Sequence, residues 1–200
     1  MFGINLSMPY KQAVIPYLDD LTESARLIGA VNTVLHQDGL LIGHNTDGIG
    51  FFKSLETLRA FHVRNKRLTI LGGGGASTAI IAQAAIDGAK EITIFCRPQS
   101  VERTVATVQT IAQSTGVSLQ VLPNNDSQLL AEHINNSDLL INGTSVGMDG
   151  TSLPLPATIR FPEELLVADV IYQPFETPLL KMANSQGNPT INGLGMLLFQ

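Results

Sequence analysis

The sequence predicts an α/β fold whose main part is a doubly wound parallel sheet with helices on both faces. Residues 67–98 follow the order strand, glycine-rich turn, helix, strand, which is typical of a dinucleotide-binding βαβ unit. After this unit, short apolar runs typical of buried strands alternate with helical patterns. The expected strands are 118–122, 138–143 and 165–172, and the expected helices are 101–114, 127–134 and 177–186. A Rossmann-like sheet of this kind binds its ligands at the carboxyl ends of its strands.

The glycine-rich turn is suited to a pyrophosphate. Gly72 can form the tight turn off the strand, and Gly74 and Gly75 let the backbone approach a ligand closely. Ser77 and Thr78 are expected to open the next helix, whose free N–H groups and positive dipole end favour an anion. Because nucleotide-free α/β turns and methyltransferase loops can show the same pattern, the turn alone does not decide the ligand.

The residue after the second strand indicates which dinucleotide the unit prefers. An NAD site usually has Asp or Glu there, about 20 residues past the glycines, to bind the ribose 2′-hydroxyl. This chain has Arg97, and a guanidinium suits a 2′-phosphate by its charge and its fork geometry. The sequence therefore favours NADP over NAD.

The first part of the chain, to about residue 58, has a different order of expected helices and strands. The expected elements are a strand at 3–7, helices at 8–18 and 21–30, a hairpin over 30–45 and a third helix from about 47. Thr22 is a plausible N-cap for the second helix, and Asp38-Gly39 is a turn signal inside the hairpin. In the third helix, four apolar residues fall at helical spacing and are expected in the core: Phe51, Phe52, Leu55 and Leu58.

Composition and charge exclude several classes of function. The chain has 200 residues, 44% of them hydrophobic and 14% charged, which suits one or two packed domains rather than a disordered chain. Its net charge of −5, without a Lys/Arg run, argues against nucleic acid as a partner. No apolar stretch is long enough to span a bilayer, and no signal peptide is expected. The single Cys96, read as a buried strand-end residue, and four scattered histidines predict no disulfide, no metal and a cytoplasmic location.

The first part also supplies candidate reactive groups. A nicotinamide enzyme must hold a carbinol carbon against the nicotinamide ring and must move the hydroxyl proton. A lysine–aspartate pair such as Lys11 and Asp47 can move that proton, and Asn5, Ser7 and Asn32 offer hydrogen bonds to a polyhydroxylated substrate. Three of these residues have an ordinary structural interpretation as well: Lys11 as an exposed lysine, Asp47 as a turn or N-cap residue and Asn32 as a hairpin residue.

Taken together, the motifs resemble those of the shikimate dehydrogenase family, including its quinate/shikimate dehydrogenase branch. The matching segments are GINLSMPYK at 3–11, GAVNT at 29–33, GHNTDGIG at 43–50, GGGGAS at 72–77, NGTSVGM at 142–148 and INGLGMLLFQ at 191–200. The resemblance implies reversible, NADP-dependent oxidation of shikimate to 3-dehydroshikimate, a step of aromatic amino-acid (chorismate) biosynthesis. It further implies a cytoplasmic monomer or homodimer that binds shikimate or a related polyhydroxylated cyclohexene acid.

The resemblance also implies roles for individual residues. Lys11 would be the catalytic lysine with Asp47 as its partner. The substrate would be bound by Asn5, Ser7, Asn32, Tyr172 and Gln200. The pyrophosphate would lie on Gly72, Gly74, Gly75, Ala76 and Ser77, and the 2′-phosphate on Arg97. The nicotinamide side would be flanked by Asn142, Thr144 and Met196, with Gly193 allowing a close backbone approach.

Departures from the family pattern leave alternatives open. The family's second basic residue close behind Arg97 is missing, with Arg103 only further on, so the resemblance favours NADP and leaves room for NAD. Asn192 stands where the family usually has Asp. A quinate/shikimate dehydrogenase that uses NAD or NADP is therefore an alternative. A folate- or glutamyl-tRNA-linked reductase is a weaker one, because Asn5, Asn32 and Asp47 suit a polyol.

The family normally begins with a Ser-x-Ser segment and ends in closing helices, and neither matches this chain. We therefore expect an incomplete N-terminal α/β substrate domain over 1–58, an NADP-binding domain over 59–190, and the start of a returning helix over 191–200. A further alternative is a truncated, catalytically impaired fragment that still binds NADP(H).

Overall fold

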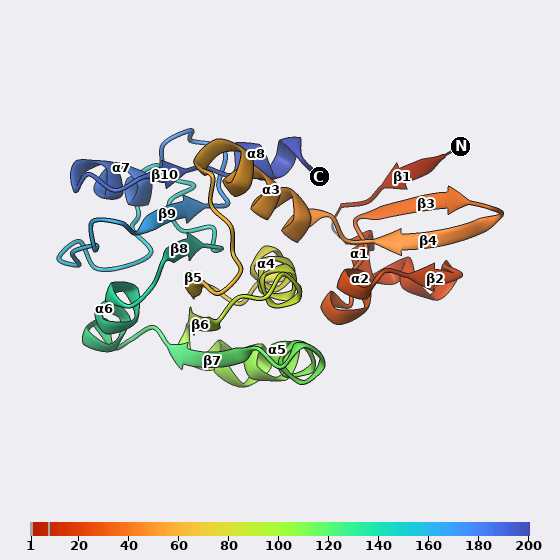
Figure 1. Cartoon of the computed structure of the whole chain (residues 1–200), viewed down its shortest axis with the longest axis horizontal. Helices are drawn as coiled ribbons and strands as arrows, with labels where there is room; N and C mark the ends of the chain where they lie inside the picture. Colours follow the sequence, from red (N-terminus) through yellow and green to blue (C-terminus); the bar gives the residue numbers. More distant parts are fainter. Residues whose placement is uncertain (1, 8) are drawn as a thin grey trace.

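The computed structural model, which describes residues 2–7 and 9–200, contains two sheets of different kinds. The smaller sheet has the strand order β1-β3-β4-β2, and the larger has the order β10-β9-β8-β5-β6-β7 with every pair parallel. Figure 1 shows the smaller sheet in a narrow lobe that carries the N-terminus and the larger one in a broad lobe, with α3 between them. The α/β class and the doubly wound parallel sheet are thus confirmed.

The smaller sheet is built on the predicted hairpin. Strands β3 (Thr33–Gln37) and β4 (Leu40–His44) are antiparallel, and the turn residues Asp38 and Gly39 have φ values of 52° and 85°. Positive φ at both central residues is the requirement of a type I′ hairpin turn, which an Asp-Gly pair meets at low cost. The short strands β1 (Gly3–Asn5) and β2 (Asp20–Leu21) pair with β3 and β4.

The predicted helix over 8–18 is wrong as a single element. The chain forms α1 (Tyr10–Ala13) and then the 3₁₀ turn η1 (Ile15–Tyr17), while Met8 lies outside the described residues. Pro16 explains the break, because it has no N–H to continue the hydrogen bonding of the α-helix. The next helix, α2 (Glu23–Ile28), begins later than predicted because Leu21 belongs to β2.

The third helix, α3 (Asp47–Arg59), packs against the broad lobe. Phe51, Phe52 and Leu55 are buried as predicted, but Leu58 is 51% exposed, so its expected place in the core is wrong. A side chain at Gly48 would collide with the backbone of α4 (Gly75–Ile86), and one at Gly50 with that of α8 (Leu194–Leu198). Glycine therefore permits the close helix contacts that join α3 to the larger sheet.

The larger sheet follows the predicted βαβ order. Strand β5 (Arg67–Leu71), α4 and β6 (Glu91–Cys96) form the first unit, and α4 begins at Gly75, two residues before the predicted start. The remaining elements are η2 (Pro98–Ser100), α5 (Val101–Thr115), β7 (Ser118–Pro123), α6 (Ser127–Asn135), β8 (Leu139–Asn142), β9 (Leu166–Asp169), α7 (Pro178–Ser185) and β10 (Thr190–Ile191).

Two apolar cores lie on opposite faces of this sheet. One contains Leu139 and Ile141 with side chains of α3, α4, α5 and α8, and the other contains Leu140 with side chains of α6 and α7. Successive residues of β8 thus serve alternate cores, as a strand covered on both faces must. The strand order reverses between β5 and β8, and such a switch point opens a crevice at the carboxyl ends of the strands.

Candidate functional site

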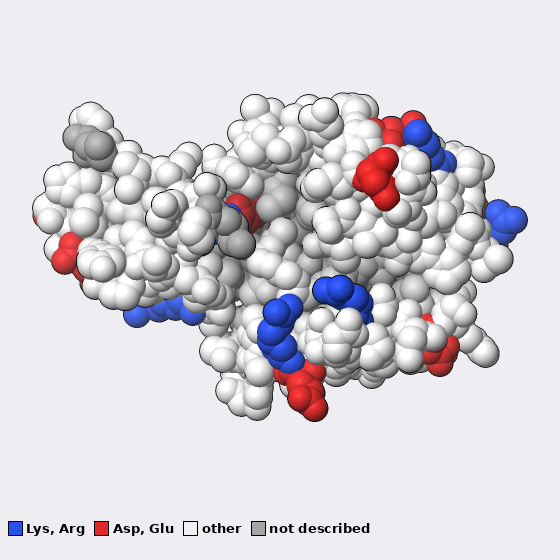
Figure 2. Space-filling model, turned by 180° about the vertical axis from the view of Figure 1, so that it is seen from behind, with Lys and Arg blue, Asp and Glu red and all other residues white. Residues whose placement is uncertain are grey.

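Lys11 and Asp47 form an ion pair, although they are far apart in the sequence. The Lys11 Nζ lies 2.8 Å from Asp47 Oδ2, and the two side chains are 26% and 10% exposed. Lys11 comes from α1, whereas Asp47 is the first residue of α3. The space-filling view shows a hollow between the narrow and broad lobes, with acidic and basic atoms at its bottom (Figure 2).

A network of amide side chains fixes the carboxylate of Asp47. The Asn32 Nδ2 donates to Asp47 Oδ1 at 2.8 Å, so that both carboxylate oxygens have a donor. The Asn32 Oδ1 accepts from the Thr46 N–H at 3.0 Å, and the Asn45 Oδ1 accepts from the Asp47 N–H at 3.2 Å. Asn32 is therefore more than a hairpin residue, because its amide ties the hairpin to the first turn of α3.

The other predicted substrate residues differ in how closely they are connected to the pair of Lys11 and Asp47. Asn5 connects to Asn32 through the Thr33 hydroxyl, which bonds Asn5 Oδ1 at 3.4 Å and Asn32 Oδ1 at 3.0 Å. The Ser7 carbonyl accepts from Tyr10 N–H at 2.9 Å in the turn before α1. Gln200 lies against Gly50, one helical turn from Asp47. Tyr172 instead lines a separate hollow of about 530 Å³ together with Thr144 and Met148.

A pocket of about 530 Å³ lies over the glycine-rich turn. Gly72 has a φ of 95° and lies so close to Thr144 that a side chain would collide with it. At Gly74 and Gly75, in contrast, an added Cβ would have no atom within 4 Å, so the space above them is open. Among the residues that the structure describes, no side chain caps the N-terminus of α4, which leaves its first N–H groups available to an anion.

Two residues at the start of α5 also line this pocket, and the prediction did not assign them a role. Arg103 joins the predicted Arg97 at the wall, and Thr104 is 1% exposed with a hydroxyl that has no hydrogen-bond partner among the described residues. A buried hydroxyl without a partner is costly unless a ligand or water satisfies it. The signal was present in the sequence, since a helix predicted to start at Val101, four residues after Arg97, places its first turn at the same edge of the sheet.

The predicted Asn142 faces the protein interior. Its side chain is fully buried, its Nδ2 donates to both oxygens of Asp169 at 3.1 Å, and its Oδ1 accepts from the Thr144 N–H at 3.1 Å and hydroxyl at 2.7 Å. Thr144, unlike Asn142, lines the open pockets. The amide of Asn142 therefore holds Thr144 in place and does not line a pocket itself.

Asp169, at the end of β9, is a third residue without a predicted role. It is 0% exposed, and burial raises the pKa of its carboxyl above the ordinary value, against the lowering effect of hydrogen bonds from Ile171, Asn142 and Thr177. An aspartate that ends an apolar strand at the carboxyl edge of a parallel sheet is a signal that the sequence offered.

The predicted Gly193 lies just before α8, and the predicted Met196 lies within it. A side chain at Gly193 would place its Cβ 1.9 Å from the Val170 carbonyl oxygen, so the close backbone approach that requires glycine is to the loop after β9. Met196 is buried in the core shared by α3 and α4. Both residues thus fix α8 against the broad lobe.

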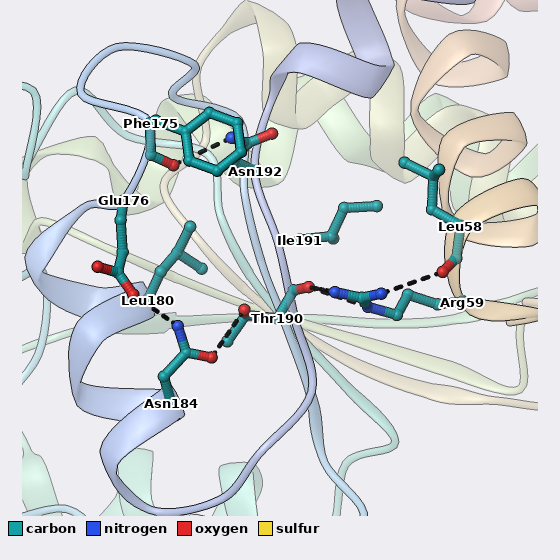
Figure 3. Close-up of a pocket in the computed structure, with 9 residues that line it drawn as sticks. All are labelled: Leu58, Arg59, Phe175, Glu176, Leu180, Asn184, Thr190, Ile191 and Asn192. Carbon is teal, nitrogen blue, oxygen red and sulfur yellow. Dashed lines mark hydrogen bonds between the residues drawn. The ribbon is translucent and has the colours of Figure 1, made fainter.

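Another hollow, of about 550 Å³, lies at the β10 edge, outside the predicted site. Its polar side chains bond one another or nearby backbone, as Figure 3 shows. The Arg59 guanidinium donates to the Thr190 carbonyl at 3.0 and 2.6 Å, and the Asn184 amide donates to Glu176 at 2.7 Å. Because these groups are already paired, the hollow offers few directed contacts to a ligand.

Within residues 2–7 and 9–200, no three His, Cys, Asp or Glu side chains come together in a group that could hold a metal ion. In the same ranges, the helices are too short or too polar to cross a membrane. Cys96 is buried, as expected for a strand-end structural residue.

Comparisons with known proteins are consistent across sequence and structure. Residues 1–34 match a family model described as the shikimate dehydrogenase substrate binding domain. The chain is 84% identical over 200 residues to the shikimate dehydrogenase (NADP⁺) of Streptococcus suis, covering 100% of this chain and 69% of that relative.

Two solved structures extend the likeness to the fold. Shikimate 5-dehydrogenase from Listeria monocytogenes, in complex with shikimate and NAD, superposes with a TM-score of 0.93 at 42% identity, covering 100% of this chain and 70% of that one. Shikimate 5-dehydrogenase from Thermus thermophilus, in complex with NADP(H) and shikimate, superposes with a TM-score of 0.81 at 33% identity, covering 100% of this chain and 69% of that one.

Proposed function

We propose that this chain, which belongs to the shikimate dehydrogenase family, interconverts shikimate and 3-dehydroshikimate with NADP. The observation that carries the proposal is the ion pair of Lys11 and Asp47, 2.8 Å apart and held at the first turn of α3 by Asn32. A charged pair whose side chains are only 26% and 10% exposed, rather than one on an open surface, is suited to moving one proton at a bound substrate. The relatives named above act on or bind shikimate, which supports the same substrate class here.

Lys11 is the proton carrier in this proposal. In the direction of reduction, the Lys11 ammonium donates a proton to the carbonyl oxygen of the substrate as that carbon receives a hydride. In the direction of oxidation, the Lys11 amine takes the hydroxyl proton as the hydride leaves. Asp47 accepts a hydrogen bond from Lys11 in both directions and so keeps Nζ aimed at one place. Asn32 holds Asp47 in turn, which limits the number of arrangements the pair can take.

NADP, when bound, carries the hydride to or from the substrate carbon. The open space above Gly74 and Gly75 and the uncapped start of α4, with Ala76 and Ser77, suit the pyrophosphate. Arg97 suits the 2′-phosphate, and we add Arg103 as a second guanidinium because it lines the same pocket. Thr104, whose buried hydroxyl lies against Gly73, supports the glycine-rich turn from below in this proposal rather than contacting the cofactor.

We assign substrate binding to residues 1–58 and cofactor binding to 59–190, with 191–200 connecting back to α3. The match of residues 1–34 to a substrate-binding domain supports the first assignment. Asn5, Ser7, Asn32 and Gln200 would bind the substrate hydroxyls near the pair, and Tyr172 would close the site from the other lobe. A cytoplasmic monomer or homodimer is part of the same proposal, which the single unpaired Cys96 supports.

The test is NADP⁺ reduction followed at 340 nm with shikimate as the second reactant. We expect shikimate-dependent turnover that is lost in Lys11→Met, while NADPH binding, followed by its fluorescence, is kept. Quinate with NAD⁺ is run in parallel, and faster turnover of that pair would favour the quinate/shikimate branch. NADPH binding without turnover of either substrate by the folded wild-type chain would refute the proposal and favour a cofactor-binding fragment.

A further inference from the structure

We propose that Asp169 is the residue that positions the nicotinamide-facing loops of the site, an inference that rests on the proposed function. Asp169 ends β9 beside Asn142, which ends β8, and the two residues are in register in the sheet. Both are fully buried. A carboxylate with 0% exposure needs a specific reason to be there, because burying a charge without partners is expensive.

Toward the cofactor pocket, Asp169 acts through Asn142. Both Asp169 oxygens accept from Asn142 Nδ2 at 3.1 Å, which turns the Asn142 Oδ1 toward the loop after β8. There Oδ1 accepts from the Thr144 N–H and hydroxyl at 3.1 and 2.7 Å. The methyl group of Thr144 lies directly over Gly72 in the glycine-rich turn. Asp169 is thereby connected to a residue that lines both the glycine-turn pocket and the hollow of Tyr172.

On its other side, Asp169 joins the two ends of the loop after β9. Its Oδ1 accepts from the Ile171 N–H at 3.0 Å, and its Oδ2 accepts from the Thr177 hydroxyl at 2.8 Å. Between these anchors, the loop places Tyr172 in one hollow. It places Phe175 and Glu176 in the other hollow, where Figure 3 shows both side chains. One carboxylate thus fixes a segment that separates the two hollows.

The same loop holds the start of α8. The Ile171 carbonyl accepts from the Gly193 N–H at 3.0 Å, and the Phe175 carbonyl accepts from Asn192 Nδ2 at 3.0 Å. The loop position that Asp169 sets is therefore passed to the helix that carries Met196 and leads to Gln200. The positions of Thr144, Tyr172 and Met196, which were predicted from three separate motifs, therefore depend on Asp169.

The chemistry of the surroundings selects a carboxylate at this position. All three groups that contact Asp169 are donors: the Asn142 amide, the Ile171 N–H and the Thr177 hydroxyl. An asparagine would turn its own NH₂ toward at least one of these donors and would leave a buried group without a partner. Burial raises the pKa of Asp169, and the hydrogen bonds from these donors, rather than a neighbouring cation, oppose that shift.

The test compares two ligands that differ in the nicotinamide half. Asp169→Asn is measured with NADPH and with adenosine 2′,5′-bisphosphate, which has only the adenosine half. We expect the Kd of NADPH to rise about tenfold, which corresponds to one lost hydrogen-bond contribution, while the Kd of the bisphosphate changes less than about twofold. Shikimate turnover is expected to fall further than NADPH binding, because Tyr172 and Thr144 also lose their positions.

Two further variants separate positioning from stability. Thr177→Val removes one donor to Asp169 and also the N-cap of α7, where the Thr177 hydroxyl oxygen accepts from the Leu180 N–H at 3.4 Å. Thr177→Ser keeps both interactions, so the serine variant is expected to restore the NADPH affinity that the valine variant loses. Thr69→Val is the matched control, because Thr69 is also buried in the sheet but bonds Ser137 at the opposite end. It is expected to lower the melting temperature without changing the NADPH-to-bisphosphate ratio.

The inference fails if Asp169→Asn weakens both ligands equally, if it weakens neither, or if Thr69→Val gives the same pattern. The proposed function fails separately, if the wild-type chain binds NADPH but does not turn over shikimate. In that case the ratio of the two dissociation constants still decides the role of Asp169, because it requires no substrate.

Discussion

Lys11 Nζ and Asp47 Oδ2 are 2.8 Å apart, although 36 positions separate the two residues in the chain. We expect Lys11→Met to lower kcat by about 100- to 10,000-fold, the range typical of losing a general acid or base. NADPH affinity is expected to stay near that of the wild type, because the cofactor pocket lies on the broad lobe. Steady-state kinetics and fluorescence titration measure the two effects.

Lys53→Met is the matched control for this prediction. Lys53 also forms a lysine–carboxylate pair on α3, with Glu56 at 2.8 Å, but both side chains are exposed. Exposed pairs contribute little, so neither kcat nor stability should change much. An equal loss of activity in both lysine variants would show that Lys11 acts through charge or folding and not through proton transfer.

The two arginines of the cofactor pocket are expected to differ in their effect on NADP and NAD. Arg97→Ala should raise the KM for NADP about 10- to 100-fold, as the loss of a charge-assisted hydrogen bond implies, and leave the KM for NAD nearly unchanged. Arg103→Ala should act in the same direction but more weakly, since it enters from the first turn of α5. Steady-state kinetics of each variant with NADP and with NAD measure the two KM values and so test both predictions.

Arg64→Ala provides the control for the arginine variants. Arg64 lies against Gly88, beyond the C-terminal end of α4 and thus far from the glycine-rich turn. If Arg64→Ala changes the NADP-to-NAD ratio as much as Arg97→Ala does, a general change of net charge explains the effect and the 2′-phosphate assignment is wrong.

The elements that could be predicted from the sequence are those set by neighbouring residues. The βαβ unit has a short apolar strand, a glycine-rich turn and a helix, each with its own local signal. The Asp38-Gly39 turn is similarly local, because positive φ at two adjacent positions selects the residue types. By contrast, β10 has two residues, which is too short for any periodicity to appear.

The parts that could not be predicted depend on partners distant in the chain. Thr22 occupies the N-cap position of α2, yet its hydroxyl bonds the Gly43 carbonyl at 3.3 Å and makes no capping bond. Asp169 has no local pattern that shows it would meet Asn142, 27 positions earlier. Likewise, Lys11 and Asp47 could be proposed as a pair from the sequence, but their spacing along the chain does not bring them together, because that requires the hairpin between them to fold.

Two glycines are expected to respond in opposite ways to alanine. Gly193→Ala would put a Cβ 1.9 Å from the Val170 carbonyl oxygen, so we expect a loss of about 1–3 kcal/mol in the free energy of unfolding. Gly74 has a φ of −84° and open space around an added Cβ, so Gly74→Ala should keep or slightly raise stability while weakening NADPH binding. Urea denaturation and fluorescence titration test both, and a destabilised Gly74→Ala variant would contradict the view that its role is in binding.

Burial of Asp169 has a consequence for stability as a function of pH. Its pKa is raised above the ordinary 3.8 in the native state, so the native protein holds this proton over a pH range in which the unfolded chain has released it. Stability therefore falls as pH rises from about 3.8 through the raised pKa, and this contribution is constant above it. Asp169→Asn cannot titrate, so the difference in unfolding free energy, variant minus wild type, is expected to increase across that window.

Urea denaturation of both proteins between about pH 4 and 7 measures this difference, because the contributions of the other acidic groups are the same in both proteins and cancel. A difference that stays flat or decreases with pH would mean that the native pKa of Asp169 is not raised and that its hydrogen-bond donors outweigh its burial.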